Sequence, residues 1–312
     1  MKDQITSNIL MIRPVNFRYN EETAKNNYYQ KVIEGLTPER AQLEAEAEFD
    51  RFVDKLREKG VMVTVIPDNK SPDTPDSIFP NNWISFHQDG KVGLYPMYAV
   101  SRRGERRQDI IDTLSEQFVV KDIIDFTKHE SSNEFLEGTG SLVLDRPNST
   151  AYAAISERTD PLVLEEFCKS FGYQAVSFTA NQLVDGTRMS IYHTNVMMCV
   201  ANDFAVICLD SIDDRQERNT VVESLKSSGK EVIDITEDQV HHFAGNMLQV
   251  LGTNNQPYLV MSSAAYHSLQ QDQLDAIKKH CSIIHSSLDT IEACGGGSAR
   301  CMMAEVFLPE RK

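Results

Sequence analysis

Long apolar segments are missing from this sequence of 312 residues, and so is any surplus of positive charge. No run of about 18 apolar residues is present, which is the length that a membrane-spanning helix needs. Basic residues number 31 against 46 acidic ones, so the formal net charge is -15. A surface of this charge repels phosphate backbones and anionic lipids. Neither nucleic acid nor a membrane is therefore an expected partner.

Cysteines are few, and none of them forms a CxxC pair. Their sparse, irregular spacing excludes a disulfide framework and favours free thiols in a reducing compartment. The N-terminal residues also lack the layout of a secretory signal, so we expect a cytoplasmic protein. One alternative use of these thiols is a zinc site made by Cys281, His280 and His285, but no second ligand pair has a suitable spacing. Neither a metal nor a cofactor is expected.

The hydrophobic periodicity repeats one unit along the chain: a hairpin of two apolar strands, an amphipathic helix and a short strand. An Asp89-Gly90 turn marks the first hairpin. Four such units occupy residues 83–126, 141–178, 195–236 and 246–287. A fifth is split across the chain ends: a strand at 301–307 joins strands at 8–14 and 61–67, with a long helix between them from about residue 21 to residue 59.

Five ββαβ units, the last closed by joining the N- and C-termini, predict an α/β fold of the five-bladed propeller type with pseudo-fivefold symmetry. Chance repetition in an ordinary α+β domain is the alternative. A length of 312 residues is compatible with two domains or with one larger closed architecture. The repeat favours a single catalytic domain that spans residues 1–312.

Polar or reactive residues stand at the start of the inner strand of each unit, and a ring would bring them to one end of its central channel. They are Asn82, Glu137, His193 with Asn195, Asn246 and Cys301. A thiolate that attacks, an imidazole that moves protons and a carboxylate that fixes the imidazole tautomer make a nucleophilic set. The run GGGSAR before Cys301 lets backbone N–H groups approach a reacting centre, and Arg300 is expected to favour the thiolate. The sequence thus predicts a covalent catalyst.

Four motifs resemble a known family. They are FLEGTGS (135–141), YHTN (192–195), FAGNMLQV (243–250) and GGGSARCMMAEVF (295–307). In this order they are similar to the guanidino-modifying branch of the pentein fold, which includes arginine deiminase, dimethylarginine dimethylaminohydrolase and arginine:glycine amidinotransferase. The resemblance implies the five-bladed propeller, with Cys301 as nucleophile, His193 as general acid/base and Glu137 as its acidic partner. The resemblance is compatible with a homo-oligomer but does not decide the oligomeric state.

The resemblance also implies a set of substrate-binding residues. In those relatives an aromatic residue stands three places before an aspartate; here these positions are Phe79 and Asn82. Those relatives carry a second aspartate two places after the histidine, and this sequence has Asn195 at that position. Arg158 resembles the arginine that holds the α-carboxylate, with a plain surface arginine as the alternative. Asp76 is the candidate for the α-amino group, and Asn246 completes the binding set.

The two asparagines predict the substrate. A guanidinium has only donors and carries a charge that buried carboxylates must meet, whereas an amide both donates and accepts. Asparagine therefore suits a neutral ureido group, and we expect hydrolysis of citrulline to ornithine, carbon dioxide and ammonia through a Cys301 intermediate, closest to a citrulline-hydrolysing branch.

Several alternatives remain at this point. They are a hydrolase of the arginine deiminase or dimethylarginine dimethylaminohydrolase type, an amidinotransferase, and a non-catalytic binding protein like the translation-factor branch of penteins. The complete Cys301, His193 and Glu137 set argues against the last of these. Residues 13–20 and 187–192 are both candidates for a loop that closes over the substrate.

Overall fold

The computed structural model describes residues 3–311, and within them the predicted unit recurs five times. Each unit is a three-stranded sheet with one antiparallel and one parallel pair. Four of the sheets follow the chain: β3 (Ile84–Phe86), β4 (Lys91–Leu94) and β5 (Asp122–Asp125); β6 (Val143–Asp145), β7 (Thr150–Ala154) and β8 (Gln174–Phe178); β11 (Met198–Val200), β12 (Phe204–Ile207) and β13 (Glu231–Asp234); β14 (Leu248–Leu251), β15 (Pro257–Ser262) and β16 (Ser282–Ser286).

The fifth sheet joins the two ends of the chain, as the sequence predicts. β1 (Asn8–Arg13) pairs in parallel with β2 (Met62–Pro67) and antiparallel with β17 (Ala304–Glu305). Within the described residues the strands form separate sheets, and none of these sheets closes on itself. The observed fold is therefore a mixed α/β fold of five three-stranded sheets, with one further two-stranded sheet among the described residues.

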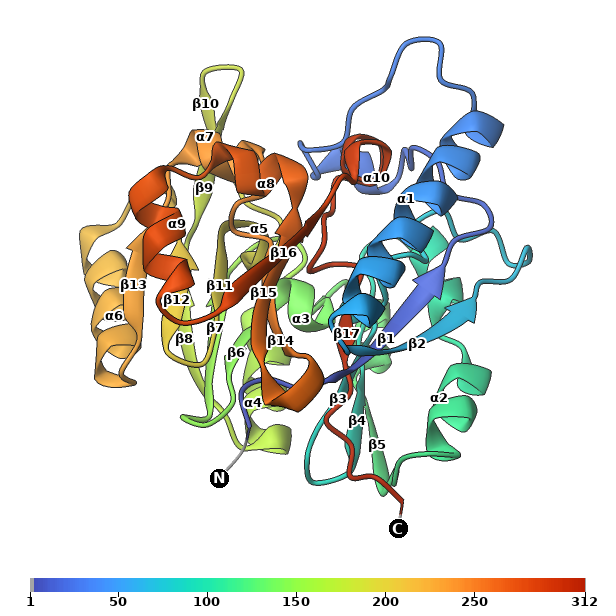
Figure 1. Ribbon diagram of the computed structural model, residues 1–312, viewed down its shortest axis with the longest axis horizontal. Helices are drawn as coiled ribbons and strands as arrows, with labels where there is room; N and C mark the ends of the chain where they lie inside the picture. The colour runs from blue at the N-terminus through green and yellow to red at the C-terminus, as the bar shows by residue number, and fades with distance from the viewer. Residues whose placement is uncertain (1–2, 312) are drawn as a thin grey trace.

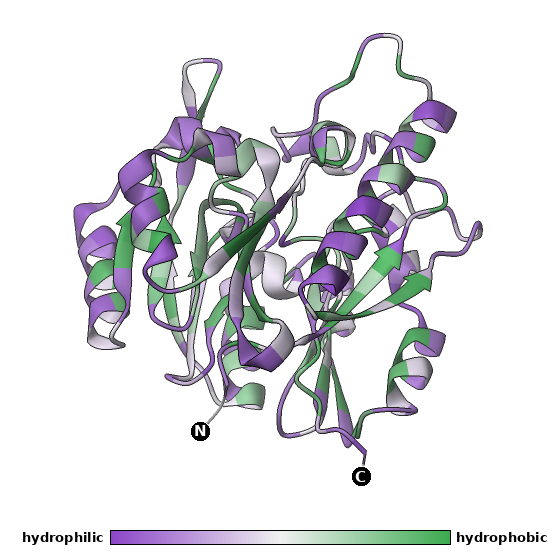
Figure 2. Ribbon diagram, in the orientation of Figure 1, coloured by the Kyte–Doolittle hydropathy of each residue, from purple (hydrophilic) through white to green (hydrophobic). Residues whose placement is uncertain are grey.

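The longer helices lie on the outside of the sheets, with the chain ends at one end of the molecule and the hairpin of β9 (Asn181–Val184) and β10 (Thr187–Ser190) at the other (Figure 1). The helix of each unit is, in chain order, α2 (Gln108–Ser115), α4 (Pro161–Phe171), α6 (Arg215–Ser227), α9 (Gln271–Lys278) and α1 (Pro38–Glu58). Apolar residues concentrate on the strands, and hydrophilic ones cover the outward faces of the helices (Figure 2). Trp83, the single tryptophan, is buried in the core beneath α2, beside Ile84 and Ile110.

One predicted element is wrong. The helix expected from about residue 21 begins only at Pro38, because Thr37 caps it and Pro38 occupies its first turn. Residues 26–37 contain no regular helix or strand, and Thr23–Lys25 is a single 3-10 turn (η1). This segment instead places polar side chains over the predicted catalytic residues, as described below.

The sequence pattern also missed short elements between the units and one inside the fourth unit. They are the hairpin β9 (Asn181–Val184) and β10 (Thr187–Ser190), and the helices α7 (Glu237–His241), α8 (Ser263–Ser268) and α10 (Asp289–Gly295). None of the helices in residues 3–311 combines the length and apolarity needed to span a membrane. All six cysteines are buried free thiols.

Candidate active site

Five short turns, each directly before the inner strand of a sheet, carry the predicted catalytic residues. Asn82 ends the 3-10 turn η2 (Pro80–Asn82) before β3, and Glu137 begins α3 (Gly138–Ser141) before β6. His193 begins α5 (Thr194–Met197) before β11. Asn246 and Cys301 precede β14 and β17 in the same way. The repeat therefore explains why residues so distant in sequence meet.

Glu137 and His193 form a buried pair. His193 Nε2 lies 2.7 Å from Glu137 Oε2, and the two side chains are 2 % and 0 % exposed. Glu137 Oε1 accepts a hydrogen bond from the backbone N–H of Tyr98 at 2.9 Å. A carboxylate only accepts, so Nε2 carries the proton and Nδ1 keeps its lone pair. Nδ1 faces Gly140, where a Cβ atom would lie only 2.8 Å away.

The surroundings shift both acid–base groups of this pair. Burial raises the pKa of Glu137, but the Arg158 guanidinium and the His193 hydrogen bond outweigh burial and hold the pKa well below its usual range. Burial lowers the pKa of His193 to about 4, although Glu137 opposes this shift. At neutral pH the pair is thus a carboxylate and a neutral imidazole, whose Nδ1 is unprotonated.

Two asparagine amides surround the sulfur of Cys301. The amide N–H₂ of Asn246 lies 3.2 Å from Sγ, and that of Asn195 lies 3.4 Å from it. The Asn195 carbonyl oxygen Oδ1 is buried and has no hydrogen-bond partner among the described residues. Asn195 therefore offers a donor to the sulfur and a free acceptor on its other side.

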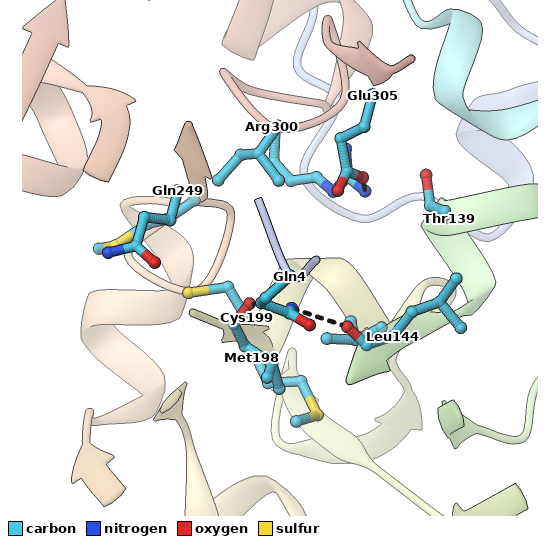
Figure 3. A pocket seen from close by; sticks show the side chains of 12 residues that line it. Gln4, Thr139, Leu144, Met198, Cys199, Gln249, Arg300 and Glu305 are labelled. Atoms are coloured by element: carbon cyan, nitrogen blue, oxygen red, sulfur yellow. Dashed lines mark hydrogen bonds and ion pairs between the residues drawn. The ribbon is translucent and has the colours of Figure 1, made fainter. Parts of the chain in front are cut away.

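Arg300 does not reach this sulfur, contrary to the sequence-based expectation. Its guanidinium bonds Glu305 Oε2 at 2.6 Å and the carbonyl of Met303 at 2.8 Å. Figure 3 shows Arg300 beside Glu305 in a separate pocket that Gln4 also lines. The ion pair with Glu305 therefore holds the Arg300 guanidinium in a different pocket from the cavity that Cys301 lines.

Asn82 is oriented by an arginine that the sequence analysis did not single out. Arg102 Nη1 donates to Asn82 Oδ1 at 2.8 Å, and its Nε and Nη2 each donate to Glu105 at 2.8 Å. Because a guanidinium only donates, the Asn82 oxygen faces it and the N–H₂ group points the other way. That N–H₂ group is buried without a partner among residues 3–311 and sits near Gly140.

A small cavity of about 10 Å³ lies among these groups. Cys301, His193, Asn82 and the ring of Phe79 line it, and Phe79 packs against Gly295 and Gly297, where any Cβ atom would collide with the ring. Asp76 also lines the cavity.

One oxygen of Asp76 is unused in this cavity. Asp76 Oδ2 accepts from Asn20 at 2.7 Å and from Thr23 at 3.1 Å, while Oδ1 has no partner among the described residues. Burial raises the pKa of this carboxyl, although Arg102 opposes the shift. An additional cation at Oδ1 would stabilise its ionised form.

Arg158 is fully buried rather than a surface residue. Its Nη1 lies 3.4 Å from Glu137 Oε2, its Nε donates to Asn26 Oδ1 at 3.0 Å, and its Nη2 donates to the carbonyl of Thr23 at 2.9 Å. The guanidinium thus connects the catalytic carboxylate with the segment that replaces the predicted helix.

That segment covers the cavity. Asn27 Nδ2 donates to the carbonyls of Gly295 and Gly296, Gln30 Nε2 donates to the carbonyl of Cys294 at 2.9 Å, and Thr23 and Asn27 line the cavity. Of the two predicted closing loops, residues 13–20 contribute Asn20, and residues 187–192 contribute Tyr192. The covering residues therefore lie mainly in 20–31, just beyond the first of these ranges.

The proposed zinc ligands have other contacts. His280 bonds Glu231 at 2.9 Å, and His285 stacks on Tyr266 with ring centroids 4.2 Å apart. Among residues 3–311, no group of three His, Cys, Asp or Glu side chains is arranged to hold a metal ion.

Comparison with known proteins identifies the family. The family model described as "N,N dimethylarginine dimethylhydrolase, eukaryotic" matches residues 13–308. The chain belongs to this family. It is thus a member of the guanidino-modifying pentein superfamily, as its motifs suggested. No curated protein matches the sequence.

Solved structures of other penteins share the fold. ArgZ, an arginine dihydrolase from cyanobacteria, superposes with a TM-score of 0.74 at 17% identity over 97% of this chain and 41% of ArgZ. The pentein therefore spans about two fifths of full-length ArgZ, but it covers 98% of the substrate-bound N-terminal domain of ArgZ, with a TM-score of 0.72 at 16% identity. A dimethylarginine dimethylaminohydrolase adduct gives a TM-score of 0.62 at 12% identity, with coverage of 96% and 100%.

Arg102, Glu105 and the covering segment are the parts of the pentein site that sequence reasoning missed. The i, i+3 spacing of Arg102 and Glu105 is a weak signal of an ion pair on one helical face. Nothing in that spacing tells a surface pair from a buried one. Thr23 and Asn26 were obscured because their surroundings read as helix, whereas Asn20 lies in the range 13–20 that was a candidate closing loop.

Proposed function

We propose that this pentein is a cysteine-dependent hydrolase of the C–N bond in a ureido amino acid, and that it converts citrulline to ornithine, carbon dioxide and ammonia. The observation that carries the proposal is a pair of unpartnered amide groups of opposite character. Asn82, which lines the cavity, offers a buried donor; Asn195, which contacts the sulfur of Cys301 and is not among the residues that line the cavity, offers a buried acceptor. A ureido group has one carbonyl oxygen and N–H donors, so it fits both.

The orientation of both amides is set by their neighbours. The Arg102 guanidinium can only donate hydrogen bonds, so it binds the amide oxygen of Asn82. The N–H₂ group of Asn82 therefore points away from Arg102. The N–H₂ group of Asn195 donates to the sulfur of Cys301, and the amide oxygen of Asn195 has no partner among the described residues. A guanidinium, which has only donors, would face the Asn82 donor unfavourably.

The contacts of Glu137 favour the same substrate class. Glu137 is the carboxylate that a guanidinium would seek, but Arg158 and the N–H groups of His193 and Tyr98 already occupy it. A second cation would therefore compete with Arg158 for this carboxylate. A neutral ureido group does not add to the buried charge.

In the proposed reaction, His193 Nδ1 takes the thiol proton of Cys301 as the sulfur attacks the ureido carbon. The imidazolium then gives this proton to the terminal nitrogen, the C–N bond breaks, and ammonia leaves. A thiocarbamate remains, whose carbonyl joins the Cys301 sulfur to the δ-nitrogen of ornithine. His193 next deprotonates a water that attacks this carbonyl, and it returns the proton to the departing sulfur. The resulting N-carboxylated ornithine releases carbon dioxide.

The remaining groups bind the amino-acid end. Asp76 Oδ1 is placed to accept the α-ammonium group, and Phe79 covers the ureido plane. Arg158 holds the α-carboxylate once Asn26 releases it, because Asn26 Oδ1 accepts from two of its nitrogens as a carboxylate oxygen would. We also propose that the five sheets are arranged as a ring, with these turns at one end of its channel.

A second candidate comes from the structural neighbours. ArgZ is described as an arginine dihydrolase, and its N-terminal domain covers nearly the same length as this chain. Hydrolysis of arginine through citrulline to ornithine would use the same site twice. The ureido step of that sequence is the one that Asn82 and Asn195 are suited to.

The test is to supply purified protein with citrulline, arginine or a methylated arginine and to measure ornithine, citrulline and ammonia. Ornithine and one ammonia from citrulline support the proposal. Ornithine from both citrulline and arginine favours the dihydrolase. Citrulline as the final product from arginine refutes the ureido assignment, and turnover that survives Cys301→Ser refutes the covalent route.

A further inference from the structure

Asn246 lies beside the nucleophile rather than in the wall of the substrate cavity. Its N–H₂ group is 3.2 Å from Cys301 Sγ and 3.0 Å from the backbone carbonyl of Asn195. Its oxygen accepts from the backbone N–H groups of Arg300 at 3.0 Å and of Cys301 at 3.4 Å. The side chain is 0 % exposed, and it is not among the residues that line the cavity.

These contacts fix the orientation of the amide. Two backbone N–H groups can be met only by the oxygen, so the nitrogen must face the sulfur and the Asn195 carbonyl. One side chain thereby joins the turn that carries Cys301 to the turn that carries His193 and Asn195. A flipped amide would place donors against donors on one side and leave the Asn195 carbonyl unpaired on the other.

The position of Arg300 makes this donor important. The guanidinium next to Cys301 in sequence is bonded to Glu305 and Met303. The side-chain donors that the structure places on the sulfur are the neutral amides of Asn195 and Asn246. Hydrogen bonds to an ionised acceptor are stronger than those to a neutral one, so both amides favour the thiolate over the thiol.

We infer that Asn246 is a catalytic residue that stabilises the Cys301 thiolate, working with Asn195 as a neutral pair of N–H donors. This role rests on the proposed function only in taking Cys301 as the nucleophile. It applies equally to ureido and guanidino substrates, because Asn246 touches the sulfur and not the cavity.

The test needs no substrate. Iodoacetamide alkylates thiolates, and the rate at Cys301 can be followed by mass spectrometry of its peptide between pH 5 and pH 10. Asn246→Asp keeps the acceptor for the two backbone N–H groups but replaces the N–H₂ donor with an anionic oxygen. The matched control is Asn254→Asp, the same chemical change at an exposed residue with a positive φ that Asp tolerates.

Asn246→Asp is expected to slow alkylation at pH 7 by about 10- to 100-fold, and to move the half-maximal rate up by about one pH unit or more. Asn254→Asp should match the parent chain. An unchanged pH profile in a variant that melts like the parent would overturn the inference, since a purely structural role would alter melting and not the profile.

If Asn246→Asp does not fold, Asn195→Asp tests the same idea, because it removes the other donor to the sulfur. In this variant the half-maximal alkylation rate of Cys301 must also move to higher pH, and an unchanged dependence of the rate on pH overturns the inference. A shift in alkylation together with failure to hydrolyse citrulline would refute the proposed function while supporting the role of Asn246.

Discussion

The Asn82→Asp substitution tests the basis of the substrate assignment. Arg102 Nη1 lies 2.8 Å from the oxygen that the two residues share, so the new carboxylate gains a charge-assisted hydrogen bond. The variant is therefore expected to fold. Its second oxygen takes the place of the unpartnered N–H₂ group and faces the cavity. The change thus replaces a donor to the ureido oxygen with an anion.

The magnitude follows from two losses at one buried position. The ureido oxygen loses its hydrogen bond and remains unpaired, which costs about 1–3 kcal/mol, and it then faces a carboxylate, which adds about 2 kcal/mol more. A total of about 3–5 kcal/mol corresponds to a decrease in kcat/KM of roughly 10²- to 10⁴-fold. Arg102 neutralises much of the new charge, so the gain in kcat/KM for arginine is expected to stay below about tenfold.

The assay is initial-rate formation of ornithine from citrulline, with arginine tested in parallel. Asn254→Asp serves as the control for the chemical change at an exposed site. Thermal melting of both variants verifies the fold. If Asn82→Asp retains kcat/KM for citrulline within about threefold of the parent value, the donor–acceptor argument is wrong.

Three further outcomes follow from the buried charges. Glu137→Gln leaves Arg158 unpaired and removes the fixed tautomer of His193, so thermal unfolding should show a loss of about 3 kcal/mol, and ornithine formation should fall by about 10³-fold or more; full activity in a folded variant would exclude the acid–base role. The pKa of His193 is lowered by burial to about 4, below its value in the unfolded chain, so the unfolded chain binds this proton first. The free energy of unfolding should decline by up to about 3 kcal/mol as the pH falls from about 6.5 to about 4. In His193→Gln, the free energy of unfolding measured with urea should depend less on pH over this range. Burial raises the pKa of Glu292 to about 7, so its effect has the opposite sign: stability is lost as the pH rises from about 4.5 to about 7. Glu292→Gln, which keeps an acceptor for Ser298, should raise the melting temperature at pH 8 more than at pH 5, and equal shifts would contradict this.

The sequence predicted the repeating elements because each unit is locally encoded. The Asp89-Gly90 turn, the alternating strands and the capped helices are all signals within a few residues. The segment from residue 21 to residue 37 misled the prediction because its charged residues read as a helical surface. Its asparagines act through distant partners, such as Asn27 with Gly296, that periodicity does not encode.

The proximity of the proposed catalytic residues was predictable because each stands at the same place in its unit. Cys301, His193 and Glu137 needed only the repeat and the motif to be grouped. Arg102 and Glu105 were not predictable in this way, because they lie in the 3-10 turn η3 (Val100–Glu105) outside the repeated positions. The orientation of an amide side chain depends on such partners. The sequence therefore shows that an amide is present, and only the structure shows which way its oxygen and its N–H₂ group point.

The buried charges around the cavity restrict the substrate further. Arg102 is paired with Glu105 and Arg158 with Glu137, which leaves Asp76 as the cavity-lining carboxylate with an unpartnered oxygen. The α-ammonium group of an amino acid pairs with this oxygen, and its α-carboxylate replaces Asn26 on Arg158. These charges select an α-amino acid: with a neutral side chain, the cations Arg102, Arg158 and the α-ammonium group meet the carboxylates of Glu105, Glu137, Asp76 and the substrate. Three cations against four carboxylates give a net charge of −1, so the charge count does not separate a ureido group from a guanidinium. The ureido assignment rests instead on the unpartnered donor of Asn82 and the unpartnered acceptor of Asn195.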